Sequence, residues 1–228
     1  MLFDLRGKGR RRTIKVIYLS LAFLMDGGLV LLGIGADVNG GLLNAITGAP
    51  SGDTGEERYR KQAADALART KANPNDAAAW RDLTRARIQV AGSGDRLDTN
   101  TGEYTDEGKE RLRLAVSSWE KYIELDDPDG DERASIASRM VQTFVALGDF
   151  TQAARAQEII AEDRQSVGAY SQLAVLSYRA GQTRKGDLAA KKAVELAPED
   201  EREALKGQLE SEKSQSLVNQ VAPTPEAE

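Results

Sequence analysis

Between residues 56 and 214 the apolar positions recur every three or four residues, in runs separated by Gly, Pro, Asn and Asp. This spacing puts the apolar side chains of each run on one face of an α-helix. The pattern breaks at Gly148 and again at Gly181, 33 residues later. A break repeated at a fixed interval divides the region into helix pairs, as in a repeat protein. We therefore predict an all-α fold built from helical hairpins.

The last helix pair, residues 169–198, has the clearest repeat pattern. An aromatic residue, a leucine and several small residues follow at set intervals, and a proline closes the pair. These positions resemble those of the tetratricopeptide repeat (TPR), a helix-turn-helix unit of about 34 residues. The preceding pair resembles it too, but has Gln165 at the closing position. The residues that carry the resemblance are Tyr170, Leu173, Ala174, Gly186, Ala190, Ala193 and Pro198 in the last pair, and Phe144, Gly148, Asp149, Phe150 and Ala153 in the preceding one.

An earlier unit begins at Asn75, with Trp80 and Leu83 at the aromatic and leucine positions. Its second helix, expected over residues 112–125, is delayed by an insertion at residues 92–108. Residues 56–72 resemble the second half of a further unit, and a charged capping helix is expected over residues 199–214. The resemblance thus implies a short TPR-like solenoid over residues 56–214. A different kind of helical-hairpin array is the alternative, and residues 215–228 are expected to form a disordered tail.

Residues 16–34 are a nearly continuous apolar run with a single charged residue, Asp26. A helix of this length extends about 28 Å, close to the thickness of the bilayer hydrocarbon. Insertion of Asp26 costs about 2.5–3.5 kcal/mol, and the Leu, Ile, Val and Phe residues of the run offset it by about 3–6 kcal/mol. We therefore predict an uncleaved transmembrane helix, with a cleaved signal peptide and a buried core helix as alternatives.

Charge is distributed unevenly around this run. Residues 1–15 hold six basic residues and one acidic residue, whereas the rest of the chain holds 25 basic and 35 acidic residues. Because positive flanks stay in the cytoplasm, we expect residues 1–15 there and the C-terminal domain outside the plasma membrane, joined by a Gly-rich tether at residues 35–55. The acidic body argues against nucleic-acid binding.

Asp26 is the least expected residue of the apolar run. Together with Ala22 and Gly33 it forms a small or polar stripe on the predicted membrane helix. A stripe of small residues lets another helix approach closely, and an intramembrane carboxyl group is expected to face protein or water. These three residues therefore predict contact with a second membrane helix, with an isolated, protonated Asp26 as the alternative.

The chain contains no Cys and no His. This composition excludes disulfides, thiol nucleophiles, Cys/His zinc sites and Ser-His-Asp triads. Acidic residues lie mainly among Lys and Arg partners at helix-surface spacing, which is typical of a solvated face. We expect a protein without enzymatic activity or cofactor, and a carboxylate-based enzyme centred on the insertion is a remote alternative.

Two acidic loops are compared with calcium-binding loops. Residues 126–132 lack the Gly and Glu positions of an EF-hand and fit the closing turn of a unit better. Asp98 to Gly102 offers alternating oxygen ligands over a turn, but the sequence equally suits a small hairpin over residues 97–104. Calcium is the less favoured interpretation of both loops.

TPR stacks bind a peptide or partner helix in a groove lined by the first helix of each unit. The resemblance implies a groove of mixed character with one basic end. The carboxylate clamp of chaperone-binding TPRs is incomplete here, because Gly168 and Gln172 occupy its basic positions in the third unit. The implied groove residues are Arg81, Arg85 and Ile88 in the first unit, Ser138, Gln142 and Val145 in the second, and Ser171, Val175 and Tyr178 in the third.

The order of segments also carries a resemblance. A basic cytoplasmic N-terminus, one membrane span and an external helical domain resemble the membrane-anchored TPR accessory subunit of the bacterial Sec translocon. This layout implies a scaffold or chaperone-like adaptor that binds proteins and is accessory to protein translocation. A structural partner in cell-envelope or division assemblies is the alternative.

Overall fold

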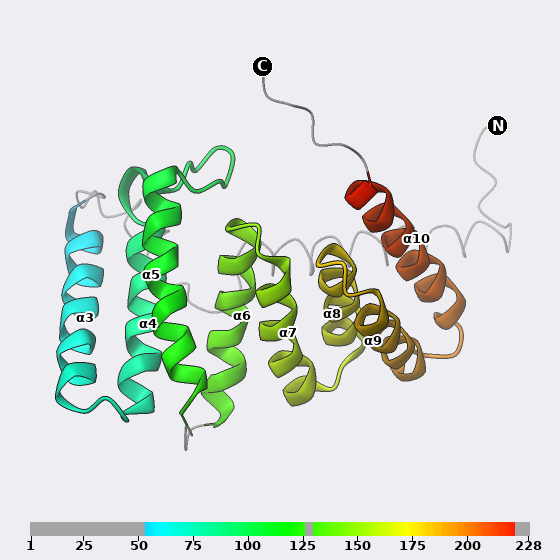
Figure 1. Ribbon diagram of the computed structural model, residues 1–228, viewed down its shortest axis with the longest axis horizontal. Coiled ribbons are helices and arrows are strands. Elements are labelled where there is room, and N and C mark those ends of the chain that lie inside the picture. Colours follow the sequence, from blue (N-terminus) through cyan, green and yellow to red (C-terminus); the bar gives the residue numbers. More distant parts are fainter. Residues whose placement is uncertain (1–52, 126–129, 222–228) are drawn as a thin grey trace, which may run out of the picture. The chain divides into compact units, whose positions relative to one another are not determined.

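The computed structural model describes residues 53–125 and 130–221, and all of them belong to one compact unit (Figure 1). The regular structure of these residues is eight α-helices and one short 3-10 helix, without a strand, so the predicted all-α class is confirmed. The helices are α3 (Asp53–Ala72), α4 (Ala77–Ala91), α5 (Asp106–Ile123), α6 (Gly130–Ala146), α7 (Phe150–Arg164), α8 (Val167–Arg179), α9 (Thr183–Leu196) and α10 (Arg202–Val221).

The predicted membrane helix at residues 16–34 lies outside the described residues, as do its three proposed contact positions, Ala22, Asp26 and Gly33. None of the helices α3 to α10 combines the length and the apolar character that crossing a bilayer requires.

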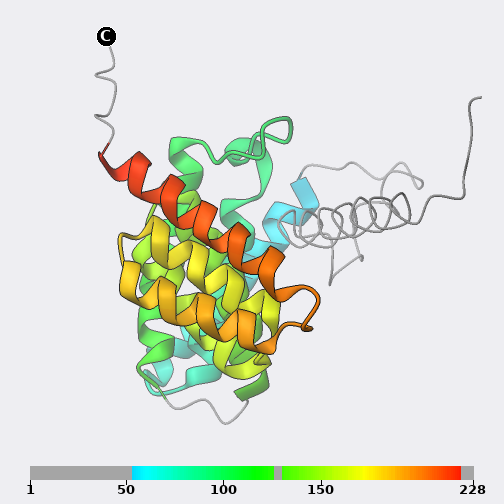
Figure 2. The same cartoon turned by 90° about the vertical axis from the view of Figure 1, so that its right-hand side faces the viewer.

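The helices pack mainly against their neighbours in the chain. Helix α4 packs between α3 and α5, α6 packs against α7, and α8 packs against both α7 and α9. Between the two groups, α6 contacts α4 and α5 over a smaller surface. The last helix, α10, lies across α8 and α9, as the view in Figure 2 shows.

Two hairpin turns have the same geometry. Gly148, between α6 and α7, has a φ of 76°, and Gly181, between α8 and α9, has a φ of 73°. In each turn the glycine N–H donates to the carbonyl three residues earlier, at 3.0 Å, and the next N–H donates to the carbonyl five residues before it, at 2.8 Å. A left-handed φ suits glycine because it has no Cβ. The 33-residue interval predicted from the sequence is therefore repeated in the hydrogen bonds of the turns.

Side-chain caps set the starts of four helices, since an oxygen at the N-cap accepts from an otherwise unpaired N–H. The start of α5 differs from the prediction. Thr105 Oγ1 accepts from Gly108 N at 3.2 Å, so α5 begins at Asp106, ahead of the predicted residue 112 and inside the predicted insertion at 92–108. The capping residues are Asp76 for α4, Thr105 for α5, Asp149 for α7 and Ser166 for α8.

The core combines many alanines with a few large side chains. Trp119 and Tyr122 pack with ring centroids 5.7 Å apart and are almost fully buried. Small residues let the helices approach closely: a Cβ on Gly186 of α9 would lie 3.1 Å from Cγ of Tyr178 in α8 and nearer still to two other ring carbons. Close packing of this kind fixes the α8–α9 hairpin.

The final helix is longer than predicted. The capping helix was expected over residues 199–214, but α10 continues to Val221, so residues 215–221 are helical and do not belong to the predicted tail. Leu209 and Ser216 of α10 are buried, and Gln220 Nε2 donates to the Tyr178 carbonyl at 2.8 Å. Ser216 and Gln220 lie beyond the predicted end at residue 214, so their contacts stabilise the additional turns of α10.

Candidate functional site

Of the predicted groove residues of α4, Arg85 contacts α6. Arg85 Nη2 lies 2.6 Å from Glu132 Oε2 of α6 and thereby joins the two first helices. The Arg81 side chain is only 11 % exposed, and Ile88 is half-buried. At the basic end of the predicted groove, Arg85 is therefore ion-paired with α6 and still partly exposed to solvent, and Arg81 is mostly buried.

The second and third sets of groove residues lie on α6 and α8. Ser138, Val145, Ser171 and Val175 are half-buried, and Gln142 is exposed. Tyr178 differs from the others because it is 4 % exposed, inside the packing of α8 against α9 and α10. Eight of the nine predicted positions therefore reach the surface, and Tyr178 does not.

Tyr178 forms a polar cluster with α9 and α10. Its hydroxyl donates to Asp187 Oδ1 at 3.0 Å, and Lys213 Nζ lies 2.8 Å from the same oxygen. Burial, followed by the nearby Asp187 carboxylate, raises the pKa of Tyr178. The hydrogen bond from Lys213 lowers the pKa of Asp187. The cluster fastens α10 to the stack.

A surface depression of about 430 Å³ lies beside this cluster, between α9 and α10. Its lining mixes four cations with three anions: Lys191, Arg202, Lys206 and Lys213 with Asp187, Glu195 and Glu210. The two signs of charge give it no preference for a ligand of one charge.

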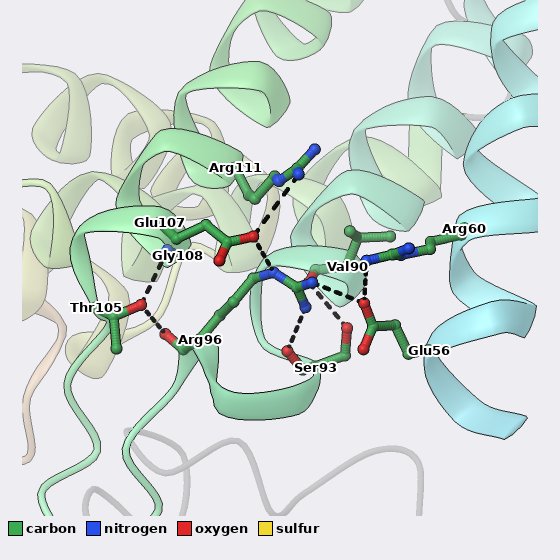
Figure 3. A network of polar contacts seen from close by, with 9 residues as sticks. All are labelled: Glu56, Arg60, Val90, Ser93, Arg96, Thr105, Glu107, Gly108 and Arg111. Carbon is green, nitrogen blue, oxygen red and sulfur yellow. Dashed lines mark hydrogen bonds and ion pairs between the residues drawn. The ribbon is translucent and has the colours of Figure 1, made fainter. Parts of the chain in front are cut away.

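The insertion after α4 is fixed by a network around Arg96, which is 9 % exposed (Figure 3). Arg96 Nη2 donates to Glu56 Oε1 of α3 at 2.7 Å, and its Nε donates to Glu107 Oε1 of α5 at 2.9 Å. Its Nη1 donates to the Ser93 carbonyl at 2.7 Å. These hydrogen bonds lower the pKa of both Glu56 and Glu107. One arginine thus joins α3, the insertion and α5.

Beyond Arg96 the chain forms the small hairpin expected from the sequence, confirmed by an antiparallel bridge between Leu97 and Tyr104. Asp98 Oδ1 accepts from Asn100 N at 2.7 Å and from Thr101 N at 3.3 Å, and these backbone hydrogen bonds lower the pKa of Asp98. The carboxylate closes the turn. In the part of the chain that the structure describes, no group of three or more acidic side chains is arranged to hold a metal ion.

Next to this network, three arginines from three different helices line one pocket of about 180 Å³. Arg60 comes from α3, Arg87 from α4 and Arg111 from α5; Figure 3 shows the Arg60 and Arg111 side chains with Val90 between them. Apolar side chains complete the wall. Helical periodicity gives no signal for this pocket, because it forms only when α3, α4 and α5 pack together. The lining residues are Arg60, Ala63, Arg87, Val90, Arg111 and Leu114.

Comparisons of this chain with protein families, with curated proteins and with solved structures find no match.

Proposed function

We propose that this chain is a non-enzymatic scaffold whose TPR-like helical hairpins bind a protein partner. The supporting observation is that, among the nine predicted groove residues on the first helices α4, α6 and α8, Gln142 is exposed, seven are half-buried and only Tyr178 is buried. Their mixture of apolar, hydroxyl, amide and basic side chains suits a peptide or helix, which needs both apolar contact and hydrogen bonds.

The proposal includes the position of the domain in the cell. The basic N-terminus and the apolar run at residues 16–34 favour a single-pass anchor in the plasma membrane, with the helical domain on the outer side. A scaffold in that place can hold polypeptides as they leave the membrane, which is the basis for proposing an adaptor accessory to protein translocation.

Site-specific crosslinking of the full chain in its own membrane tests this proposal. A photo-reactive residue at Gln142, on α6, should capture a defined partner. The same residue at Leu188 of α9, which is 65 % exposed, is the control outside the groove. We expect the Gln142 product to disappear with Val175→Asp, since the added charge lies on the predicted groove face, and to persist with Leu188→Asp.

The opposite pattern would refute the groove as the binding surface. Equal capture from both positions, or a Gln142 product that Val175→Asp leaves unchanged while circular dichroism remains helical, would place partner binding elsewhere.

A further inference from the structure

The arginine pocket lies on a different side of α4 from the predicted groove. At about 100° per residue, Arg87 is about 120° or more from the direction of Arg81 and Arg85 around the helix axis. Arg85 meets α6, whereas Arg87 Nη1 donates to the Leu114 carbonyl of α5 at 2.8 Å. The pocket is therefore a separate site, and what binds there is independent of the proposed groove.

Arg87 is the residue that gives the pocket its character. Its Nη1 also donates to the buried Ser118 Oγ at 2.5 Å, so the guanidinium is held in one place by two neutral oxygens. Among the side chains that the structure describes, in residues 55–125 and 132–220, no carboxylate lies within ion-pair distance of Arg87. Burial lowers the pKa of Arg87 without a compensating anion. A partly desolvated positive charge of this kind is stabilised when an anion arrives.

The other two arginines have carboxylate partners that they share with Arg96. Glu56 Oε1 lies 2.5 Å from Arg60 and 2.7 Å from Arg96, and Glu107 Oε1 lies 3.7 Å from Arg111 and 2.9 Å from Arg96. The Arg60 side chain is 58 % exposed and that of Arg111 is 45 % exposed. Exposed ion pairs are weak, so both guanidinium groups can turn toward a new anion at little cost.

The walls indicate what kind of anion fits. Ala63, Val90 and Leu114 provide apolar surface, and Leu114 is 45 % exposed beside the charged groups. A bare inorganic ion leaves this surface uncovered, whereas a carboxylate on an alkyl chain covers it.

We propose that this pocket binds a carboxylate side chain from an acidic segment of a protein partner. Arg87 contacts the carboxylate at the floor, Arg60 and Arg111 close over it with charge-assisted hydrogen bonds, and an apolar residue of the segment packs on Leu114. Arginine suits this role because its planar group presents paired donors to a carboxylate.

The test uses the full chain purified in detergent and a short fluorescein-labelled peptide in which glutamates flank a leucine. Fluorescence anisotropy should show saturable binding that weakens as salt is added, because part of the site is exposed. The same peptide with glutamine in place of glutamate should not bind. Glutarate should displace the labelled peptide at lower concentration than inorganic phosphate.

Variants separate the pocket from general surface charge. Arg60→Gln combined with Arg111→Gln should weaken binding about tenfold or more, since two charge-assisted hydrogen bonds are removed. Arg113→Gln is the matched control: it lies on α5 two residues from Arg111, is 58 % exposed, and is not part of the pocket lining. Arg87→Lys keeps the charge but loses the paired donors, and should also weaken binding.

Three results would overturn the proposal. They are equal binding of the glutamine peptide, equal loss of affinity in Arg113→Gln and in the double variant, and displacement by phosphate at lower concentration than by glutarate. Thermal unfolding followed by circular dichroism identifies any variant that fails to fold. Val175→Asp should leave peptide binding unchanged, so failure of the groove and failure of the pocket give different results.

Discussion

Gly186→Ala should destabilise the domain although alanine favours helices. Gly186 lies inside α9 and faces the ring of Tyr178, and an added Cβ would lie 3.1 Å from Cγ and closer to Cδ1 and Cε1. Ordinary carbon contacts are about 3.5–4.0 Å, so either the ring or the helix has to move. The ring cannot move freely, because the Tyr178 hydroxyl donates a hydrogen bond to Asp187 Oδ1. The backbone of Tyr178 is also restrained, because Gln220 Nε2 donates to its carbonyl oxygen.

The magnitude follows from two opposing effects. Overpacking a well-packed core costs about 1–3 kcal/mol. Replacing a helical glycine with alanine returns about 0.5–1 kcal/mol. The difference is a net loss of up to about 2.5 kcal/mol in the free energy of unfolding, with a fall in Tm of about 2–4 °C for each kcal/mol in a domain of this size.

Urea unfolding of the full chain, followed by far-UV circular dichroism, measures the effect. Gly207→Ala is the matched control, since Gly207 lies inside α10 and a Cβ there meets no atom within 4 Å. That variant should gain about 0.5–1 kcal/mol. In a Tyr178→Leu background, Gly186→Ala should no longer destabilise. If Gly186→Ala stabilises the wild-type protein as much as Gly207→Ala does, the close packing of α8 against α9 is refuted.

Two further predictions concern the turns and the Arg96 network. Gly148→Ala and Gly181→Ala should each cost about 1–2 kcal/mol in urea unfolding, because both turns need a left-handed residue; a loss in only one variant would contradict their equivalence. Arg96→Gln should raise the carboxylate pKa values of Glu56 and Glu107 in an NMR titration, and unchanged values would contradict the network. Since both pKa values are lowered from 4.5, their stabilising contribution is present above pH 4.5 and is lost as the pH falls through the lowered values. Protection factors for amide hydrogen exchange in the insertion, after correction for the pH dependence of the intrinsic exchange rate, should fall over that acidic range.

Local signals in the sequence account for most of the fold. Apolar periodicity identifies the helices, and the glycines at positions 148 and 181 mark the turns, because both signals act over a few neighbouring residues. The start of α5 is missed since the Thr105 cap lies in a stretch rich in Gly and Thr that reads as a loop. The end of α10 is missed because the contacts that stabilise it are made with a distant part of the chain. One example is the hydrogen bond from Gln220 of α10 to the Tyr178 carbonyl of α8.

The candidate sites are less predictable from sequence than the fold. Assigning Tyr178 to a groove follows from its place on a first helix, but its burial depends on where α10 packs. Arg60, Arg87 and Arg111 are separated by 27 and 24 positions, and each reads as an ordinary helix-surface charge. Only the packing of three helices shows that they share a pocket.

The way α10 ends the stack has a consequence for how the protein can change in evolution. Among the larger helix–helix contacts of the described residues, those of α10 are made only with α8 and α9, the last hairpin. Duplication of one hairpin ahead of residue 202 would present α10 with the same surface, provided that the copy keeps the counterparts of Tyr178 and Asp187. A chain lengthened in this way would keep α10 as its last helix and would require no new end piece.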